Sequence, residues 1–103
     1  MRIIKIATLK AFWEKEPFSE QSLLSWIREI EKAEWQNHNE LKKQFKNASI
    51  INQKRVVFNI HGNRYRLVTS FNYRLQIAFI IWIGTHKDYD KINVETIKYV
   101  KND

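Results

Sequence analysis

The sequence predicts an α+β fold in which N-terminal helices pack on one face of a small antiparallel sheet. Apolar residues recur at helical spacing before residue 48, whereas β-branched and aromatic residues alternate with polar ones after it. Two glycines and one proline punctuate the chain, so its elements should be joined by short connections. The 103 residues contain no internal repeat or linker, and we expect one domain spanning residues 1–103.

The N-terminal half should form one short strand and three helices. We expect a strand over residues 2–6 and a helix that ends at Pro17, because proline cannot continue a helix. Ser19 is a typical N-cap residue for a second helix, and Asn37 with Glu40 indicates the start of a third. The apolar side chains expected to face the core are Ile6, Leu9, Phe12, Trp13, Leu23, Trp26, Ile27, Ile30 and Ala33.

The C-terminal half should form an antiparallel meander. Residues 56–60 and 65–71 have strand character, and residues 61–63 supply a turn, since Gly and Asn tolerate a positive φ. A second turn over 72–74 leads to a third strand over 76–83. This last strand is apolar on both faces, which is typical of a central strand, and Trp82 should therefore lie in the core.

Composition excludes several classes of protein. The absence of cysteine excludes disulfide scaffolds, thiol nucleophiles and cysteine-ligated zinc, and it fits the reducing cytoplasm. No apolar run is long enough to span a bilayer. The net charge of +7 should attract polyanions, because lysine and arginine displace counterions from phosphates. Charge alone leaves an anionic membrane surface and an acidic protein partner open.

The segment 85–90 is the main candidate for chemistry. If the last strands pair as a meander, this segment lies near the start of strand 65–71. The side chains that then converge on one surface are Arg66, His86, Lys87, Asp88, Tyr89 and Asp90. Such a cluster suits RNA cleavage without a metal: arginine can stabilise a charged phosphorane, histidine can exchange protons near neutral pH, and tyrosine can donate a proton or stack on a base.

Other polar residues leave two interpretations open. Lys54 and Arg55 either bind phosphate or end a loop. His38 and His61 are more typical of exposed or hydrogen-bonded histidines than of catalysts, and with the nearby acids they form no familiar metal-ligand spacing. We therefore expect no metal and no cofactor.

Two segments resemble the HigB family of toxins. Residues 55–68, RVVFNIHGNRYRLV, resemble the RVVFNI-x-GN-x-YRL core of that family. Residues 84–92, GTHKDYDKI, resemble its GTH-x-x-YDKI ending, and the N-terminal half is also similar. The resemblance covers nearly the whole chain, and the two motifs are specific in combination.

The resemblance implies a RelE-like fold and a type II toxin–antitoxin system. It implies a cytoplasmic, ribosome-dependent and metal-independent endoribonuclease that cleaves mRNA, blocks translation and arrests growth. The implied partners are mRNA on the ribosome and a helix-turn-helix antitoxin similar to HigA, with DNA bound only through the antitoxin and with no membrane.

The family motifs also suggest roles for individual residues. The implied catalytic residues are Arg66, His86 and Tyr89, with general acid and general base left unassigned. Candidate RNA-binding residues are Lys54, Arg55, Asn63, Arg64, Lys87 and Asp90. The main alternative is a non-catalytic, basic RNA- or ribosome-binding module, and a second is a basic domain that binds an acidic protein.

Overall fold

The structure, a computed structural model, describes residues 1–99. In chain order these residues form β1 (Arg2–Ile4), α1 (Ile6–Lys15), the 3₁₀ turn η1 (Pro17–Ser19), α2 (Glu20–Lys32), α3 (His38–Gln44), β2 (Ser49–Ile50), β3 (Arg55–Ile60), β4 (Tyr65–Asn72), β5 (Ile77–Thr85) and α4 (His86–Tyr89). The α+β class predicted from the sequence is confirmed.

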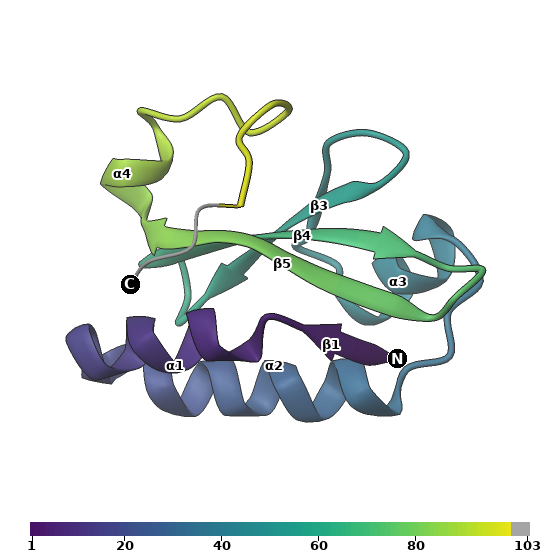
Figure 1. Ribbon diagram of the computed structural model, residues 1–103, viewed down its shortest axis with the longest axis horizontal. Helices are drawn as coiled ribbons and strands as arrows, with labels where there is room; N and C mark the ends of the chain where they lie inside the picture. The colour runs from purple at the N-terminus through teal and green to yellow at the C-terminus, as the bar shows by residue number, and fades with distance from the viewer. Residues whose placement is uncertain (100–103) are drawn as a thin grey trace.

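The sheet has five strands in the order β1-β5-β4-β3-β2. β3, β4 and β5 form the predicted antiparallel meander. β1 joins through parallel pairing with β5, with Arg2 opposite Ile77, so the sheet is mixed rather than wholly antiparallel. This direction lets α1 continue past the end of β1, beneath the second half of β5 (Figure 1). Lys5, with a φ of 75°, makes the sharp turn between β1 and α1.

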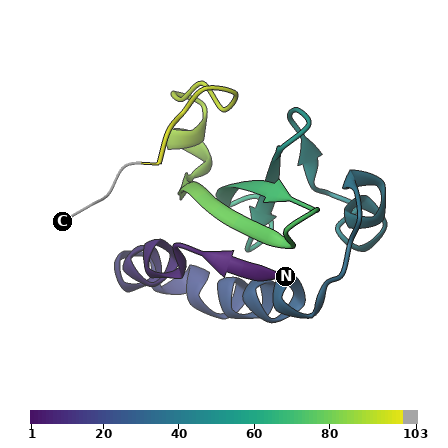
Figure 2. The same cartoon turned by 45° about the vertical axis from the view of Figure 1, so that its right-hand side comes forward.

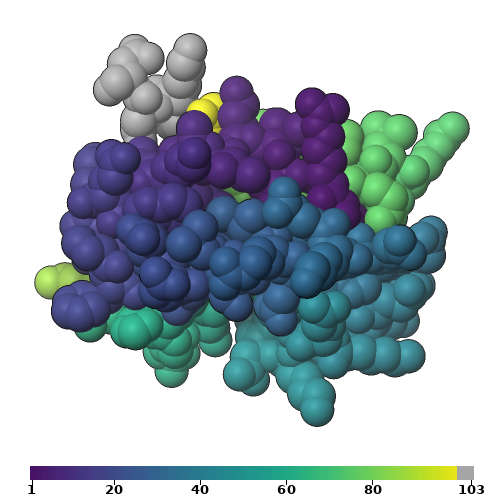
Figure 3. All heavy atoms as spheres, turned by 90° about the horizontal axis from the view of Figure 1, so that it is seen from below, coloured from purple at the N-terminus to yellow at the C-terminus, as the bar shows by residue number. Residues whose placement is uncertain are grey.

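Helices α1 and α2 lie side by side against one face of the sheet, as predicted (Figures 1 and 2). Their side chains cover most of this face in the view from below (Figure 3). The core between the layers draws on helices α1, α2 and α3 and on strands β3, β4 and β5, with buried side chains that include Leu9, Leu23, Ile30, Leu41, Phe58, Leu67 and Ile80. This packing leaves the opposite face of the sheet free to carry other groups.

The opposite face carries α4 and the segment that follows it (Figures 1 and 2). The sequence predicted the helices before residue 48, and it did not predict α4. A helix of four residues is too short to show an apolar period, so pattern analysis could not detect it. Among the described residues, no helix has the length and apolar character needed to cross a membrane.

The helix caps follow the sequence only in part. Asn37 caps α3 as predicted, since its Oδ1 accepts a hydrogen bond from the Glu40 backbone N–H at 3.0 Å. Ser19 does not cap α2 with its side chain. Its hydroxyl donates instead to the Glu16 carbonyl at 2.7 Å, because Pro17 starts a 3₁₀ turn that leads directly into α2.

The strand details correct two further expectations. In the β3–β4 turn the positive φ values belong to His61 and Gly62, at 53° and 65°, and not to Asn63. β5 lies between β1 and β4 and is therefore an interior strand, as predicted, but Trp82 is half-buried instead of lying in the core. The register places Trp82 opposite Val68, which puts its indole on the face away from the helices.

Candidate functional site

The candidate site lies where β4 begins and β5 ends. The antiparallel register pairs Tyr65 with Thr85 and Arg66 with Gly84, which brings the segment 85–90 to the start of β4, as the sequence predicted. A backbone hydrogen bond from His86 N–H to the Arg64 carbonyl, at 3.0 Å, continues this pairing into α4. The two motifs, about twenty residues apart in sequence, are therefore joined by backbone hydrogen bonds.

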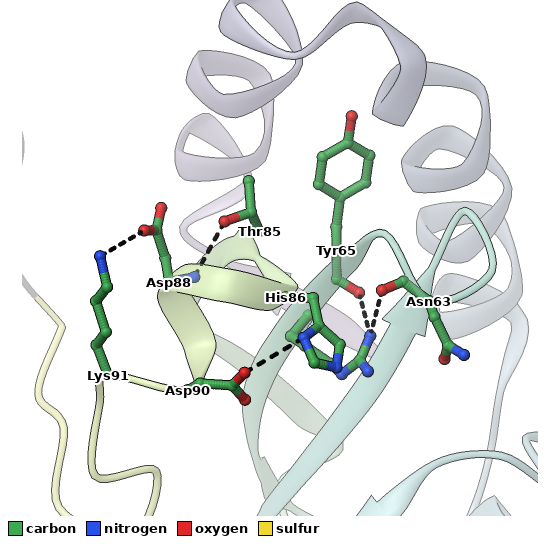
Figure 4. A network of polar contacts seen from close by, with 8 residues as sticks. Asn63, Tyr65, Thr85, His86, Asp88, Asp90 and Lys91 are labelled. Carbon is green, nitrogen blue, oxygen red and sulfur yellow. Dashed lines mark hydrogen bonds and ion pairs between the residues drawn. The ribbon is translucent and has the colours of Figure 1, made fainter.

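Arg66 is held by the hairpin that carries it. Its Nη1 donates to the carbonyls of Asn63 and Tyr65, at 3.0 and 3.3 Å (Figure 4). Nη2 and Nε make no hydrogen bond within the described part of the chain, so they remain available to an anionic ligand. The side chain is half-buried on the face away from α1 and α2. This arrangement fixes the guanidinium while leaving a two-donor edge free to bind a phosphate.

His86 opens α4 on the same side of the sheet. The hydroxyl of Thr85 accepts from the Asp88 N–H at 3.1 Å and so caps the helix. One turn later, Asp90 Oδ2 lies 3.5 Å from His86 Nδ1 (Figure 4). Their side chains are 51% and 64% exposed, so the pair contributes little to stability. The pair occupies Nδ1 of the imidazole, while Nε2 makes no hydrogen bond within residues 1–99.

Tyr89 completes the group. Its ring packs on the Trp82 indole at a centroid distance of 6.2 Å. Burial raises the pKa of the Tyr89 hydroxyl, with the Arg66 charge lowering that pKa and Asp90 raising it. The hydroxyl is therefore protonated at neutral pH and can donate its proton.

The structure does not bring all the predicted residues together. Arg55 pairs with Ser70, roughly 13 Å along the strand from Arg66, and its Nη1 donates to the Val94 carbonyl at 2.9 Å. Lys54 is exposed just before it. Arg64 turns toward the helix layer, with its guanidinium 5.0 Å from the Phe18 ring centroid.

Asn63 and Lys87 lie at the site, but neither side chain makes a hydrogen bond to the guanidinium of Arg66. Asn63 contributes its backbone carbonyl to Arg66, while its side chain points away from that contact (Figure 4). Lys87 is exposed on α4. Within residues 1–99, no three His, Cys, Asp or Glu side chains gather closely enough to hold a metal ion.

Two residues at the site were missed by pattern analysis. Trp82 was assigned to the core because its strand is apolar on both faces. Asn59 pairs with Arg66 across β3 and β4 and is exposed on the same face. The sequence could have identified Asn59, because it is a polar residue between the apolar Phe58 and Ile60 of a buried strand.

A sequence profile described as HigB_toxin, RelE-like toxic component of a toxin–antitoxin system, matches residues 19–92. This chain belongs to the HigB toxin family. The matched region holds all of β4, β5 and α4, and with them every candidate catalytic residue of this HigB toxin. The α+β arrangement agrees with the RelE-like fold, and membership implies an antitoxin as partner. No curated protein sequence matches the chain.

Proposed function

We propose that this toxin is a ribosome-dependent endoribonuclease that cleaves mRNA in the cytoplasm without a metal ion, and so blocks translation and arrests growth. The main support is the β4–β5 register, which sets an arginine with two free donors beside a histidine–aspartate pair and a protonated tyrosine. A single domain over residues 1–103 would carry the whole activity.

The proposed reaction uses the 2′-hydroxyl of the RNA as nucleophile. A base removes the 2′ proton, O2′ bonds to phosphorus, and the bond to O5′ breaks as O5′ gains a proton. The products are a 2′,3′-cyclic phosphate and a 5′-hydroxyl. The free donors of Arg66 stabilise the charge on the phosphorane. His86 transfers one of the two protons, and Tyr89, which is protonated at neutral pH, is suited to donate the other.

The other predicted residues would support this reaction in different ways. Asp90 would position His86 through their ion pair. Direct binding of RNA by Asp90 is less suitable, because its carboxylate would repel the phosphate. Lys87, on the exposed side of α4, and Asn63 would contact RNA near the reaction. Lys54, Arg55 and Arg64 lie outside the cluster, so any contact they make would be with RNA or ribosome farther from the cleaved bond.

The proposed partner is a helix-turn-helix antitoxin similar to HigA. It would bind DNA, while the toxin would reach DNA only through it. Such an antitoxin should carry acidic side chains, because the toxin has a net charge of +7.

The first test compares Arg66→Ala and His86→Ala with His61→Ala in a translation extract. His61 is an exposed turn residue, so it is a matched histidine control. We expect the Arg66 variant to lose about 10²–10³-fold and the His86 variant about 10²–10⁴-fold in cleavage rate, with wild-type melting temperatures. Full cleavage by both variants would reject this site. Ribosome binding without any cleavage by the wild type would support the non-catalytic alternative.

A further inference from the structure

A cavity of about 470 Å³ lies beside the candidate site, between the β3–β4 turn and the segment 44–48. An indentation separates these two segments in the view from below (Figure 3). Its volume falls in the range of small-ligand sites, about 300–1,000 Å³. Its lining residues include four that carry side-chain amides, Gln44, Asn47, Asn59 and Asn63, together with Lys46 and Phe58.

The cavity exists because the sheet edge is only partly covered. β2 pairs with Val56 and Val57 alone, and the rest of the outer edge of β3 faces the cavity. Both walls are held in place by hydrogen bonds. Lys42 Nζ donates to the carbonyls of Lys46 and Ala48 at 2.8 and 2.6 Å, and Arg66 fixes the opposite wall through the Asn63 carbonyl. The cavity is therefore preformed, and a ligand would pay little to order it.

The amides of this cavity differ from those of four asparagines elsewhere in the chain. Asn37, Asn52, Asn72 and Asn93 each accept a backbone N–H through their side chains, which is the ordinary structural use of asparagine in caps and turns. The four cavity amides make no side-chain hydrogen bond within residues 1–99. Each offers both a donor and an acceptor, and they are gathered on one concave surface.

The cavity borders the proposed cleavage site through Asn59 and Asn63, which neighbour Arg66. Asn59 is the direct cross-strand partner of Arg66, so their Cβ atoms lie about 4.5–5.5 Å apart on one face. A ligand bound to Asn59 would therefore lie near the Arg66 side chain. No carboxylate lines the cavity, and Lys46 adds a positive charge, so a phosphate attached to the ligand would not be repelled.

We propose that this cavity binds an unstacked nucleobase of the RNA, adjacent to the phosphate held by Arg66; this inference rests on the proposed function. Amide side chains match the paired donors and acceptors of base edges, which single-stranded RNA exposes. An apolar peptide segment fits less well, because the lining is mostly polar. The amides would then influence which positions in the message are cleaved, whereas Arg66 acts on any phosphate.

Binding is tested by NMR on ¹⁵N-labelled wild-type protein, through the side-chain NH₂ signals of the four amides. The probes are 2′-O-methyl tetranucleotides, which cannot supply the nucleophile, and a tetranucleotide of the same backbone without bases. We expect these signals to move with the base-containing probes and not with the abasic one. Equal shifts with the abasic probe, or no shifts with any probe, would overturn the proposal.

Function is tested with Asn47→Ala and Asn59→Ala, using Asn39→Ala as the matched control, since Asn39 is an exposed amide of α3 outside this cavity. The two cavity variants should bind the probes roughly three- to tenfold more weakly and change the distribution of cleavage positions, while the control does neither. Unchanged RNA binding with weakened antitoxin binding would make the cavity a protein contact and reject the proposal. If the wild type shifts the amides yet cleaves no mRNA, the base site stands and the nuclease function fails.

Discussion

At the scale of single residues, the site depends on a contact between Gly84 and the Trp82 indole. A Cβ at residue 84 would overlap the six-membered ring of Trp82. The glycine thus allows the indole to lie flat on the strand, where it supports Tyr89. Gly84 is needed for this close approach, and its backbone does not adopt a positive φ.

We predict that Gly84→Ala displaces the Trp82 ring, destabilises the fold by about 1–3 kcal/mol and lowers cleavage activity through Tyr89. Denaturant unfolding gives the stability, and the Trp82 indole N–H signal reports the displacement. Adding Trp82→Phe should restore stability, because the smaller ring leaves room for the new methyl group. A single variant with wild-type stability and an unmoved indole signal would contradict the proposed role of the glycine.

Tyr89→Phe separates the two possible roles of the tyrosine. The variant keeps the ring on Trp82 and removes only the hydroxyl. If the hydroxyl donates a proton, the cleavage rate should fall by about 10²-fold or more while KM changes little. The wild-type rate should also hold through mildly alkaline pH, because the raised pKa keeps Tyr89 protonated there. If the Tyr89→Phe variant cleaves mRNA as fast as the wild type, Tyr89 contributes only through its packing on Trp82.

At the scale of elements, His38 joins α3 to two other segments. Its Nε2 lies 2.9 Å from the Asn52 carbonyl and its Nδ1 2.5 Å from the Tyr73 hydroxyl. A carbonyl can only accept, so Nε2 carries the proton and Nδ1 of the neutral ring accepts from Tyr73. His38 is therefore a structural residue, in agreement with the sequence interpretation.

Burial, together with the Glu40 charge, raises the pKa of Tyr73 to about 12. Between pH 10 and this value the unfolded chain loses the Tyr73 proton and the folded chain keeps it, so stability falls as pH rises. We predict that Tyr73→Phe is less stable at neutral pH by about 0.5–1.5 kcal/mol, and that it declines less steeply above pH 10. Urea unfolding from pH 7 to 11 tests this, and parallel curves for both proteins would refute it.

The secondary-structure elements differ in how far the sequence could predict them. The meander followed from alternation and turn residues, and its register places Arg66 opposite Gly84, two residues before His86. The parallel β1 could not be predicted, since a three-residue strand carries no signal of direction. The position of Trp82 depended on a register shift between Val68 and Thr69, and the cavity depended on the short length of β2. Both are set by packing between distant segments, which a single sequence does not display.

At the scale of the whole molecule, one face of the sheet forms the core and the other carries the candidate site. One face is buried under α1 and α2 and supplies the core, whereas the other carries α4 (Figure 1). The side chains of Arg66 and Trp82 lie on this second face as well. Substitutions on the candidate surface can therefore change activity with little effect on stability. The net charge of +7 acts over the entire molecule and should speed its association with an RNA-rich target.

This long-range effect should depend on salt in a defined way. The molecule measures 33 × 27 × 27 Å, while the screening length is about 30 Å at 0.01 M salt and about 10 Å at 0.1 M. We predict that Lys10→Glu with Arg28→Glu, on the exposed sides of α1 and α2, slows association with ribosomes at 0.01 M salt and has almost no effect at 0.1 M. Lys87→Gln, next to the candidate site, should slow association at both salt concentrations. Stopped-flow association rates, with melting temperatures as a check on folding, measure this. A double variant that is equally slow at both salt concentrations would place the helix face in direct contact with the ribosome.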